Sequence, residues 1–263
     1  MNIFEAIILG LIQGLTEFLP VSSSGHLELG KYLFGIDHES NFFFSVAVHG
    51  ATLLSTLLVF WNDIIELLKG MAKPGMNDEK KYGLKILISM IPIGIAGFFM
   101  YQISSIFFVG NMLNLGIEFM ITSLFLILTV VIKPRERNMT YLDAFIIGLA
   151  QVLAVAPGIS RSGATIATGM MLGNKKTELA RFSFLMVLIP IVGANLLEVL
   201  SGRISMEGTC ISCIIAGFIT AFVSGYLACK LMVNLVQKGK LVWFAAYCII
   251  LGIFSILLGT NVI

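Results

Sequence analysis

Two short polar segments interrupt apolar runs and carry the side chains that can do chemistry. The first contains Gln13 and Glu17, followed by the serines and histidine of residues 22–26, SSSGH. Residues four apart share one face of a helix, so an amide oxygen and a carboxylate there can bind a hard cation, Mg²⁺ or Ca²⁺. The serine hydroxyls can act as nucleophiles, with His26 as general acid or base.

The second polar segment places an arginine among hydroxyl groups. It consists of Ser160, Arg161, Ser162, Gly163 and Thr165. A guanidinium beside hydroxyls, in a glycine-containing turn where a helix begins, favours an oxyanion or phosphate. We therefore expect this segment to bind a phosphate group.

Simpler interpretations of these residues stay open. Glu17 and Arg161 can form a structural salt bridge between the two segments. The serines can cap the helices that follow them, and His26 can be a buried, hydrogen-bonded histidine. His49, in the middle of an apolar run, either extends the site or bonds to a neighbouring helix.

The composition indicates a membrane protein. Of the 263 residues 57% are hydrophobic and 12% are charged, and the mean hydropathy is +0.96. Soluble domains carry about 25% charged residues, which excludes a soluble enzyme, a disordered protein and a DNA-binding module. The net charge of +2 does not indicate a nucleic-acid partner. We expect a single membrane domain over residues 1–263.

Six apolar runs are long enough to cross a membrane as helices, at about 1.5 Å per residue against a core of about 30 Å. They are residues 42–60, 86–108, 112–132, 182–200, 209–230 and 241–263. The four cysteines lie in these runs, and the pair Cys210 and Cys213 has no partners that would complete a zinc site. We interpret all four as packing residues.

The polar segments fit re-entrant helical hairpins better than crossings. The apolar runs 3–19 and 142–156 each end in a polar turn with a proline and are followed by short apolar runs, 27–34 and 164–172. Polar, irregular backbone at membrane depth is tolerated only inside protein or beside water. Arg161 then lies within the membrane, where ionisable residues are usually functional.

The basic residues support six crossings with two hairpins. In that layout fourteen Lys and Arg residues lie on one side of the membrane, and only Lys31 and Arg203 lie on the other. Such a bias marks the rich side as cytoplasmic, so both ends of the chain face outward. A full crossing in place of one hairpin would scatter the basic loops over both sides.

The two hairpins are related by an internal repeat. A shift of 138 residues aligns Gln13 with Gln151 and Ser22 with Ser160. Three crossings separate the hairpins, so the halves, about 1–132 and 138–263, are inverted relative to each other. The predicted fold class is an all-α integral membrane protein with six transmembrane helices and two re-entrant hairpins as an inverted repeat. Such repeats place a site near the midplane.

Both polar segments resemble motifs of the bacterial undecaprenyl-diphosphatases of the bacitracin-resistance type. Residues 13–26, QGLTEFLPVSSSGH, are similar to that family's (E/Q)xxxE region, and residues 157–165, PGISRSGAT, to its PGxSRSxxT motif. Length, hydropathy and motif spacing agree, so the resemblance covers essentially the whole chain. Gln13 is a permitted variant that leaves one carboxylate fewer at the first motif.

The resemblance implies a phosphatase of the bacterial plasma (inner) membrane. It converts undecaprenyl diphosphate to undecaprenyl phosphate and inorganic phosphate, which recycles the lipid carrier for peptidoglycan and other envelope polymers and gives bacitracin resistance. The site would open outward, use Mg²⁺ or Ca²⁺, and act on a polyprenyl diphosphate from the bilayer. A homodimer stays open.

The motifs also imply a role for each polar residue. The expected metal ligands are Gln13 and Glu17; the catalytic residues are Glu17, Ser23, His26 and Arg161; the phosphate-binding residues are Ser22, Ser24, Ser160, Arg161, Ser162, Gly163 and Thr165. We expect Ser23 to attack the terminal phosphorus while His26 handles protons, and attack by water stays open.

Two other classes compete with the phosphatase. An anion transporter would also use inverted repeats, an arginine and helix N-termini, but it does not need the cluster of Glu17, serines and His26. A structural membrane protein leaves both motifs unexplained.

Overall fold

The computed structural model describes residues 1–36, 42–107, 111–132, 135–200, 210–238 and 241–260, and these ranges are helical without any strand. The helices are α1 (Ile3–Phe18), α2 (Ser23–Leu33), α3 (Phe42–Val59), α4 (Trp61–Ala72), α5 (Asp78–Phe107), α6 (Met112–Val131), α7 (Tyr141–Leu153), α8 (Arg161–Met171), α9 (Lys176–Leu200), α10 (Ile211–Lys238) and α11 (Val242–Gly259). The predicted all-α class is confirmed.

Several helices are long and apolar enough to cross a membrane. Among the described residues they are α6, the part Ile211–Val236 of α10, and α11. A fourth candidate is the pair α3 and α4, which passes the same test but bends by 67°. Four of the six predicted runs thus coincide with candidates. The runs 86–108 and 182–200 fall in α5 and α9, parts of whose side chains lie outside the described residues. The chain is an integral membrane protein.

The run predicted over residues 42–60 coincides with α3, and after a bend the chain continues in a further helix, α4. The helix stops at Val59, and Phe60 begins a new helix without a side-chain cap. The polar face of α4 then bonds to α9, since Arg181 Nε lies 2.8 Å from Asp63 Oδ1. This amphipathic helix was not predicted.

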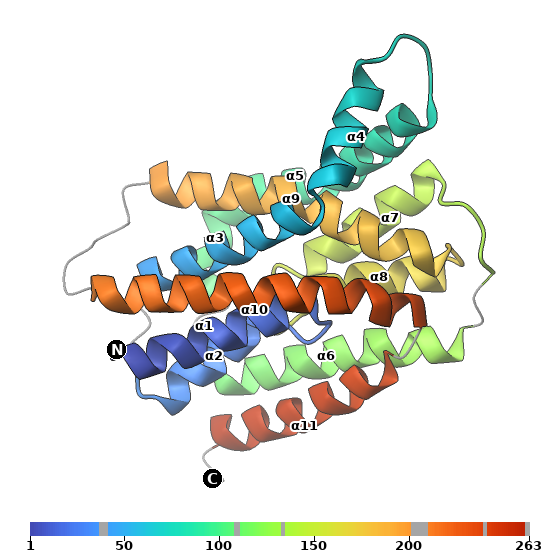
Figure 1. Ribbon diagram of the computed structural model, residues 1–263. Helices are drawn as coiled ribbons and strands as arrows, with labels where there is room; N and C mark the ends of the chain where they lie inside the picture. The colour runs from blue at the N-terminus through green and yellow to red at the C-terminus, as the bar shows by residue number, and fades with distance from the viewer. Residues whose placement is uncertain (37–41, 108–110, 133–134, 201–209, 239–240, 261–263) are drawn as a thin grey trace.

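The helices form an elongated bundle in which the two hairpins approach each other end to end (Figure 1). Helices α1 and α7 have 16 and 13 residues, so at about 1.5 Å per residue they fall short of a membrane core of about 30 Å. Their turns meet in the interior of the bundle. Ser24 Oγ donates to the Pro157 carbonyl at 2.7 Å, and Ser162 Oγ donates to the Leu19 carbonyl at 3.2 Å.

The first helix of each hairpin packs against a long helix of the other half, α1 on α10 and α7 on α5. Two glycines at corresponding repeat positions permit these contacts. A Cβ on Gly10 would collide with the backbone of Gly217, and a Cβ on Gly148 with the backbone of Ser89. The two hairpins therefore dock in the same way.

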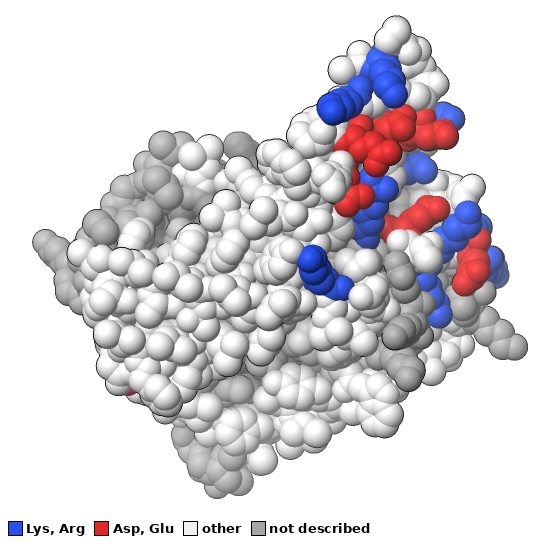
Figure 2. Space-filling model, viewed as in Figure 1, with Lys and Arg blue, Asp and Glu red and all other residues white. Residues whose placement is uncertain are grey.

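Charged side chains gather at one end of the bundle in the view of Figure 2, around α4, the start of α5 and the loops before α7 and α9. The marked ends of the chain lie at the opposite end (Figure 1). Of the basic residues used in the prediction, Lys133, Arg203 and Lys240 and the side chain of Lys238 lie outside the described residues. In this view most of the basic side chains lie at the charged end, and one lies apart from it (Figure 2).

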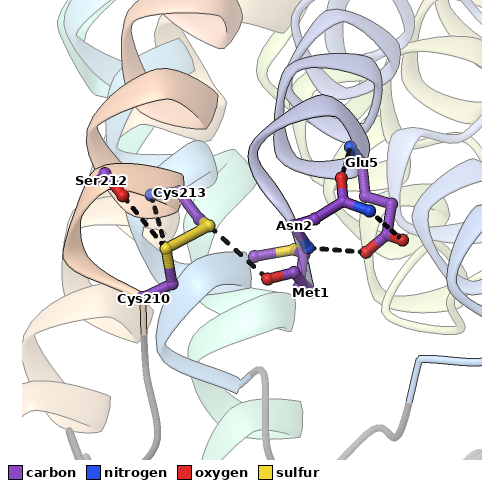
Figure 3. Close-up of a disulfide and its surroundings, with 6 residues drawn as sticks. All are labelled: Met1, Asn2, Glu5, Cys210, Ser212 and Cys213. Carbon is purple, nitrogen blue, oxygen red and sulfur yellow. Dashed lines mark hydrogen bonds between the residues drawn. A yellow bond between two sulfur atoms is a disulfide. The ribbon is translucent and has the colours of Figure 1, made fainter.

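Cys210 and Cys213 form a disulfide where α10 begins (Figure 3), so our interpretation of this pair as packing residues was wrong. The disulfide lies against the start of α1, with Cys213 Sγ 3.5 Å from the Met1 carbonyl oxygen. The spacing of three residues brings both thiols to one side of the first helical turn. Cys229 and Cys248 are buried free thiols, in agreement with the packing role.

Candidate active site

The site is built around the Glu17 carboxylate near the end of α1. Gln13 lies one helical turn earlier and donates from Nε2 to Glu17 Oε2 at 2.8 Å, and the Ser23 hydroxyl donates to the same oxygen. Arg161 approaches from the start of α8, with Nη2 3.7 Å from Glu17 Oε1. The structure thus brings together Gln13, Glu17, Ser23 and Arg161 from the two polar segments.

The first turn is held in an unusual backbone conformation at Ser22. Its φ of 67° lies in the left-handed region, which for a non-glycine residue typically costs about 1–3 kcal/mol and recurs at functional sites. The Ser22 hydroxyl accepts from Gly25 N and donates to the Pro157 carbonyl. This turn directs Ser23 toward Glu17, whereas Ser22 and Ser24 face the second hairpin.

The second turn presents Arg161 as the first residue of α8. Ser160 is the N-cap, and its hydroxyl accepts from Gly163 N at 3.0 Å. The Thr165 hydroxyl donates to the Arg161 carbonyl at 2.8 Å and also contacts Ser183 Oγ. Ser160, Gly163 and Thr165 therefore form hydrogen bonds within the turn and the first helical turn of α8. The Arg161 side chain instead approaches Glu17.

His26 is buried beside the turn and contacts α11. Its Nδ1 lies 2.6 Å from the Ser22 carbonyl oxygen and its Nε2 lies 2.9 Å from the Tyr247 hydroxyl. The imidazole also stacks on the Tyr247 ring, with centroids 5.6 Å apart. Both ring nitrogens are thus occupied, and the proton of Ser23 points to Glu17 rather than to His26.

A small pocket is lined by Glu17 and Arg161. The carboxylate and guanidinium side chains are 10% and 31% exposed. Ser162 and Ser183 add hydroxyls to the lining, and the rest of the wall is mainly apolar. The apolar lining residues are Phe18, Leu53, Phe184, Val187, Leu188 and Ile191. The pocket thus combines the charged side chains of Glu17 and Arg161 with an apolar wall between α3 and α9.

The oxygens around Glu17 fit a divalent cation in part. Among the described residues Gln13 Oε1 is buried without a hydrogen-bond partner, and an amide oxygen beside a carboxylate suits Mg²⁺ or Ca²⁺. The described residues contain no cluster of three His, Cys, Asp or Glu side chains that could hold a metal. Gln13 and Glu17 would therefore supply two ligands, and other oxygens would have to complete the coordination.

Several residues at the site carry no signal in the sequence. Tyr247, Thr122 and Ser183 lie in apolar helices outside any motif, and only their contacts reveal them. Glu118, an acid within a predicted crossing, accepts from Gly158 N at 2.7 Å. His49 Nδ1 bonds to the Ser45 carbonyl of its own helix at 2.8 Å. A buried acid in an apolar run was the one available hint.

Known proteins match this chain over nearly its whole length. The family model described as "Bacitracin resistance protein BacA" matches residues 6–254. Curated relatives named undecaprenyl-diphosphatase include those of Bacteroides fragilis, 52% identical over 97% of this chain and 98% of the relative, and of Parabacteroides distasonis, 50% identical with the same coverage. One from Carboxydothermus hydrogenoformans is 40% identical over 98% of both chains. The resemblance of the two motifs is thereby confirmed, and the chain belongs to the bacitracin resistance protein BacA family.

Proposed function

We propose that this protein hydrolyses undecaprenyl diphosphate to undecaprenyl phosphate and inorganic phosphate. The observation that carries the proposal is a pocket in which Glu17 and Arg161 meet an apolar wall, while the Ser23 hydroxyl donates to Glu17. Such a pocket suits a substrate with an anionic head and a hydrocarbon chain. The names of the relatives, undecaprenyl-diphosphatase, agree with this chemistry.

The charge of the diphosphate is balanced from the second hairpin. Arg161 supplies a delocalised positive charge that matches phosphate oxygens in geometry. Helices α2 and α8 both begin at the turns, so their N-terminal ends add a favourable electrostatic potential for an anion. In a largely buried site such fixed charges stabilise the transition state of phosphoryl transfer more strongly than in water.

Ser23 is the nucleophile in this proposal. Its oxygen attacks the terminal phosphorus, its proton passes to Glu17, and the bond from that phosphorus to the bridging oxygen breaks. Glu17 passes this proton to the departing undecaprenyl phosphate, and a phosphoserine remains. Water then attacks the phosphoserine and gives a proton to Glu17. As the bond from phosphorus to Ser23 Oγ breaks, Glu17 returns the proton to the serine oxygen and inorganic phosphate is released. Here Glu17 replaces His26 in the proton transfer, because the Ser23 hydroxyl donates to Glu17.

His26 is assigned a supporting role. It links the Ser22 carbonyl to the Tyr247 hydroxyl, and it thereby fixes the turn that orients Ser23. Direct attack by water on the diphosphate is the alternative to a phosphoserine, and replacement of Ser23 distinguishes the two.

Gln13 Oε1 and Glu17 would hold the divalent cation, together with phosphate oxygens of the substrate. When bound, the cation neutralises charge on the diphosphate. Because Gln13 provides a neutral oxygen where another carboxylate is permitted, affinity for the cation in the absence of substrate is expected to be low.

We also propose the membrane arrangement of six crossings and two re-entrant hairpins, with residues 1–263 as one domain and an inverted repeat. The equivalent docking of α1 and α7 supports it. The charged end is assigned to the cytoplasm, and the site opens outward in the bacterial plasma membrane. The disulfide at the other end of the bundle agrees with an oxidising exterior. There the enzyme would recycle the carrier lipid for cell-envelope polymers and give bacitracin resistance.

Phosphate release tests the proposed function. Purified protein in detergent is supplied with undecaprenyl diphosphate and Mg²⁺ or Ca²⁺, or with EDTA, and compared with Glu17→Ala and Arg161→Ala. We expect release that requires the cation and is lost in both variants. Well-folded wild-type protein that releases no phosphate would overturn the proposal and favour transport of an anion.

A further inference from the structure

The second turn is held from behind by two side chains of α6. Glu118 Oε2 accepts from Gly158 N at 2.7 Å. The Thr122 hydroxyl donates to the Gly158 carbonyl at 3.0 Å and accepts from Ser160 N at 2.9 Å. Three backbone groups of the turn that presents Arg161 therefore depend on one face of α6. Thr122 is 1% exposed, so water cannot readily replace its two bonds, whereas Glu118 is 6% exposed and lines a separate small pocket with Pro157.

These contacts tightly constrain the backbone just before Arg161. A Cβ on Gly158 would lie 2.5 Å from Glu118 Cβ and 2.9 Å from the Leu115 carbonyl oxygen, which leaves only a glycine room to approach α6. On its other side the turn accepts hydrogen bonds at the Pro157 carbonyl from Ser22 and Ser24. The turn is thus clamped between α6 and the first hairpin.

Glu118 and Thr122 do not line the pocket that contains Glu17 and Arg161. They act on the site only through the backbone of residues 158–160. A shift of that backbone moves the start of α8, and with it the guanidinium. Such support of a binding group by buried hydrogen bonds commonly determines how well the group is oriented.

We propose that Glu118 and Thr122 are positioning residues that hold Arg161 in its phosphate-binding orientation. The inference rests on the proposed function, because it assigns Arg161 to the phosphate. It predicts that α6, which carries neither motif, contributes to substrate affinity. It also assigns a use to a buried carboxylate that plays no part in the chemical steps.

Binding of inorganic phosphate, measured by calorimetry on the purified protein with Mg²⁺, provides a test that needs no turnover. Thr122→Val keeps the shape of the side chain and removes both hydrogen bonds, and we expect about tenfold weaker binding, because buried backbone groups lose their partners. Thr122→Ser restores the hydroxyl and is expected to restore affinity. Thr129→Val is the matched control, since the buried Thr129 bonds only to the Leu126 carbonyl of its own helix in the described structure.

A second arm separates positioning from general destabilisation. In an Arg161→Ala background, Thr122→Val is expected to have no further effect on phosphate binding, because the group it orients is gone. Glu118→Gln keeps an acceptor for Gly158 N and should bind phosphate as the wild type does, whereas Glu118→Met should not. Equal effects of the two valine variants, or additivity with Arg161→Ala, would overturn the inference. Failure of the proposed function would appear separately, as wild-type protein that binds phosphate without hydrolysing the lipid.

Discussion

The three consecutive serines of the first turn have different hydroxyl partners. Ser23 donates to the Glu17 carboxylate, while Ser22 and Ser24 donate to the carbonyl of Pro157. A carboxylate can accept a proton and a carbonyl cannot. Of the three hydroxyls, only that of Ser23 therefore has a base as its partner, although the sequence presents the three serines as equivalent.

Replacement of single serines tests this difference. Ser23→Ala should lower kcat by at least about 10³-fold, because loss of a nucleophile removes the main chemical step. Ser24→Ala should lower it less than about tenfold, since the Pro157 carbonyl keeps Ser22 as donor. Both rates are measured as phosphate released from undecaprenyl diphosphate. If Ser23→Ala keeps more than a tenth of the wild-type rate in folded protein, water is the nucleophile.

Gln13 offers a second test at the residue scale, through the cation. Gln13→Glu places a second carboxylate within one helical turn of Glu17, and ligand charge largely sets cation affinity at such sites. We expect the Mg²⁺ concentration for half-maximal phosphate release to fall by about tenfold. A titration of rate against free Mg²⁺ measures it. An unchanged or higher midpoint would place the cation elsewhere.

The hairpins were predictable because a proline and a polar turn break an apolar run at residues 20–26 and 157–163. The motifs identified Glu17, Ser23 and Arg161, which the structure brings together. Other elements left no comparable pattern. Tyr247 and Thr122 lie in largely apolar helices outside either motif, where only tertiary contacts distinguish a site residue from a lipid-facing one.

The bend before α4 and the disulfide escaped prediction for different reasons. Helix α4 was missed because its charged residues Asp63, Glu66 and Lys69 end the apolar run near residue 60, and a hydropathy pattern does not show the direction in which the chain continues. The CxxC of Cys210 and Cys213 carries no indication of its redox state in the sequence, since a buried thiol and a disulfide use the same residue. Only the three-dimensional structure shows the bend and the disulfide.

Helices α3 and α9 form the apolar wall of the pocket, and this arrangement predicts chain binding. Val187 lines the pocket, whereas Ile189, two residues along α9, is 52% exposed on the outer face. Val187→Trp should raise KM for undecaprenyl diphosphate by about tenfold. The larger side chain fills part of the pocket, so the prenyl chain loses apolar contact there. Ile189→Trp should leave KM within twofold.

Inhibition by inorganic phosphate serves as the internal reference for this pair, since phosphate has no chain to bind the wall. Its inhibition constant should be the same in Val187→Trp, Ile189→Trp and the wild type. A parallel loss of phosphate inhibition in Val187→Trp would mean that the tryptophan disturbs Glu17 and Arg161. The chain would then have to lie along another face of the bundle.

Across the whole molecule the repeat duplicates the scaffold but not the chemistry. Ser22 and Ser160 cap α2 and α8 in the same way, each accepting from a glycine three residues on. The repeat partner of Ser23, however, is Arg161, and that of Glu17 is Val155. Each hairpin therefore contributes different groups, the first a serine and a carboxylate, the second a guanidinium. Neither half alone would complete the site.

The distribution of charge along the molecule predicts how it lies in the membrane. Charged side chains gather at the end formed by α4 and the start of α5, and the end with the chain termini has few in this view (Figures 1 and 2). Transferring the charged end across the bilayer would be costly for each lysine and arginine. We therefore expect this end in the cytoplasm and the disulfide end outside.

Single cysteines introduced at the two ends test this orientation in intact cells. Asp78→Cys marks the charged end, with a side chain that is 96% exposed, and Thr260→Cys marks the exposed end of α11. A membrane-impermeant maleimide should label Thr260→Cys directly and Asp78→Cys only after permeabilisation. The wild type should stay unlabelled, because Cys229 and Cys248 are buried and the other two cysteines are bonded. The reverse pattern would turn the charged end outward, and the pocket would then have to receive its lipid from the cytoplasmic side.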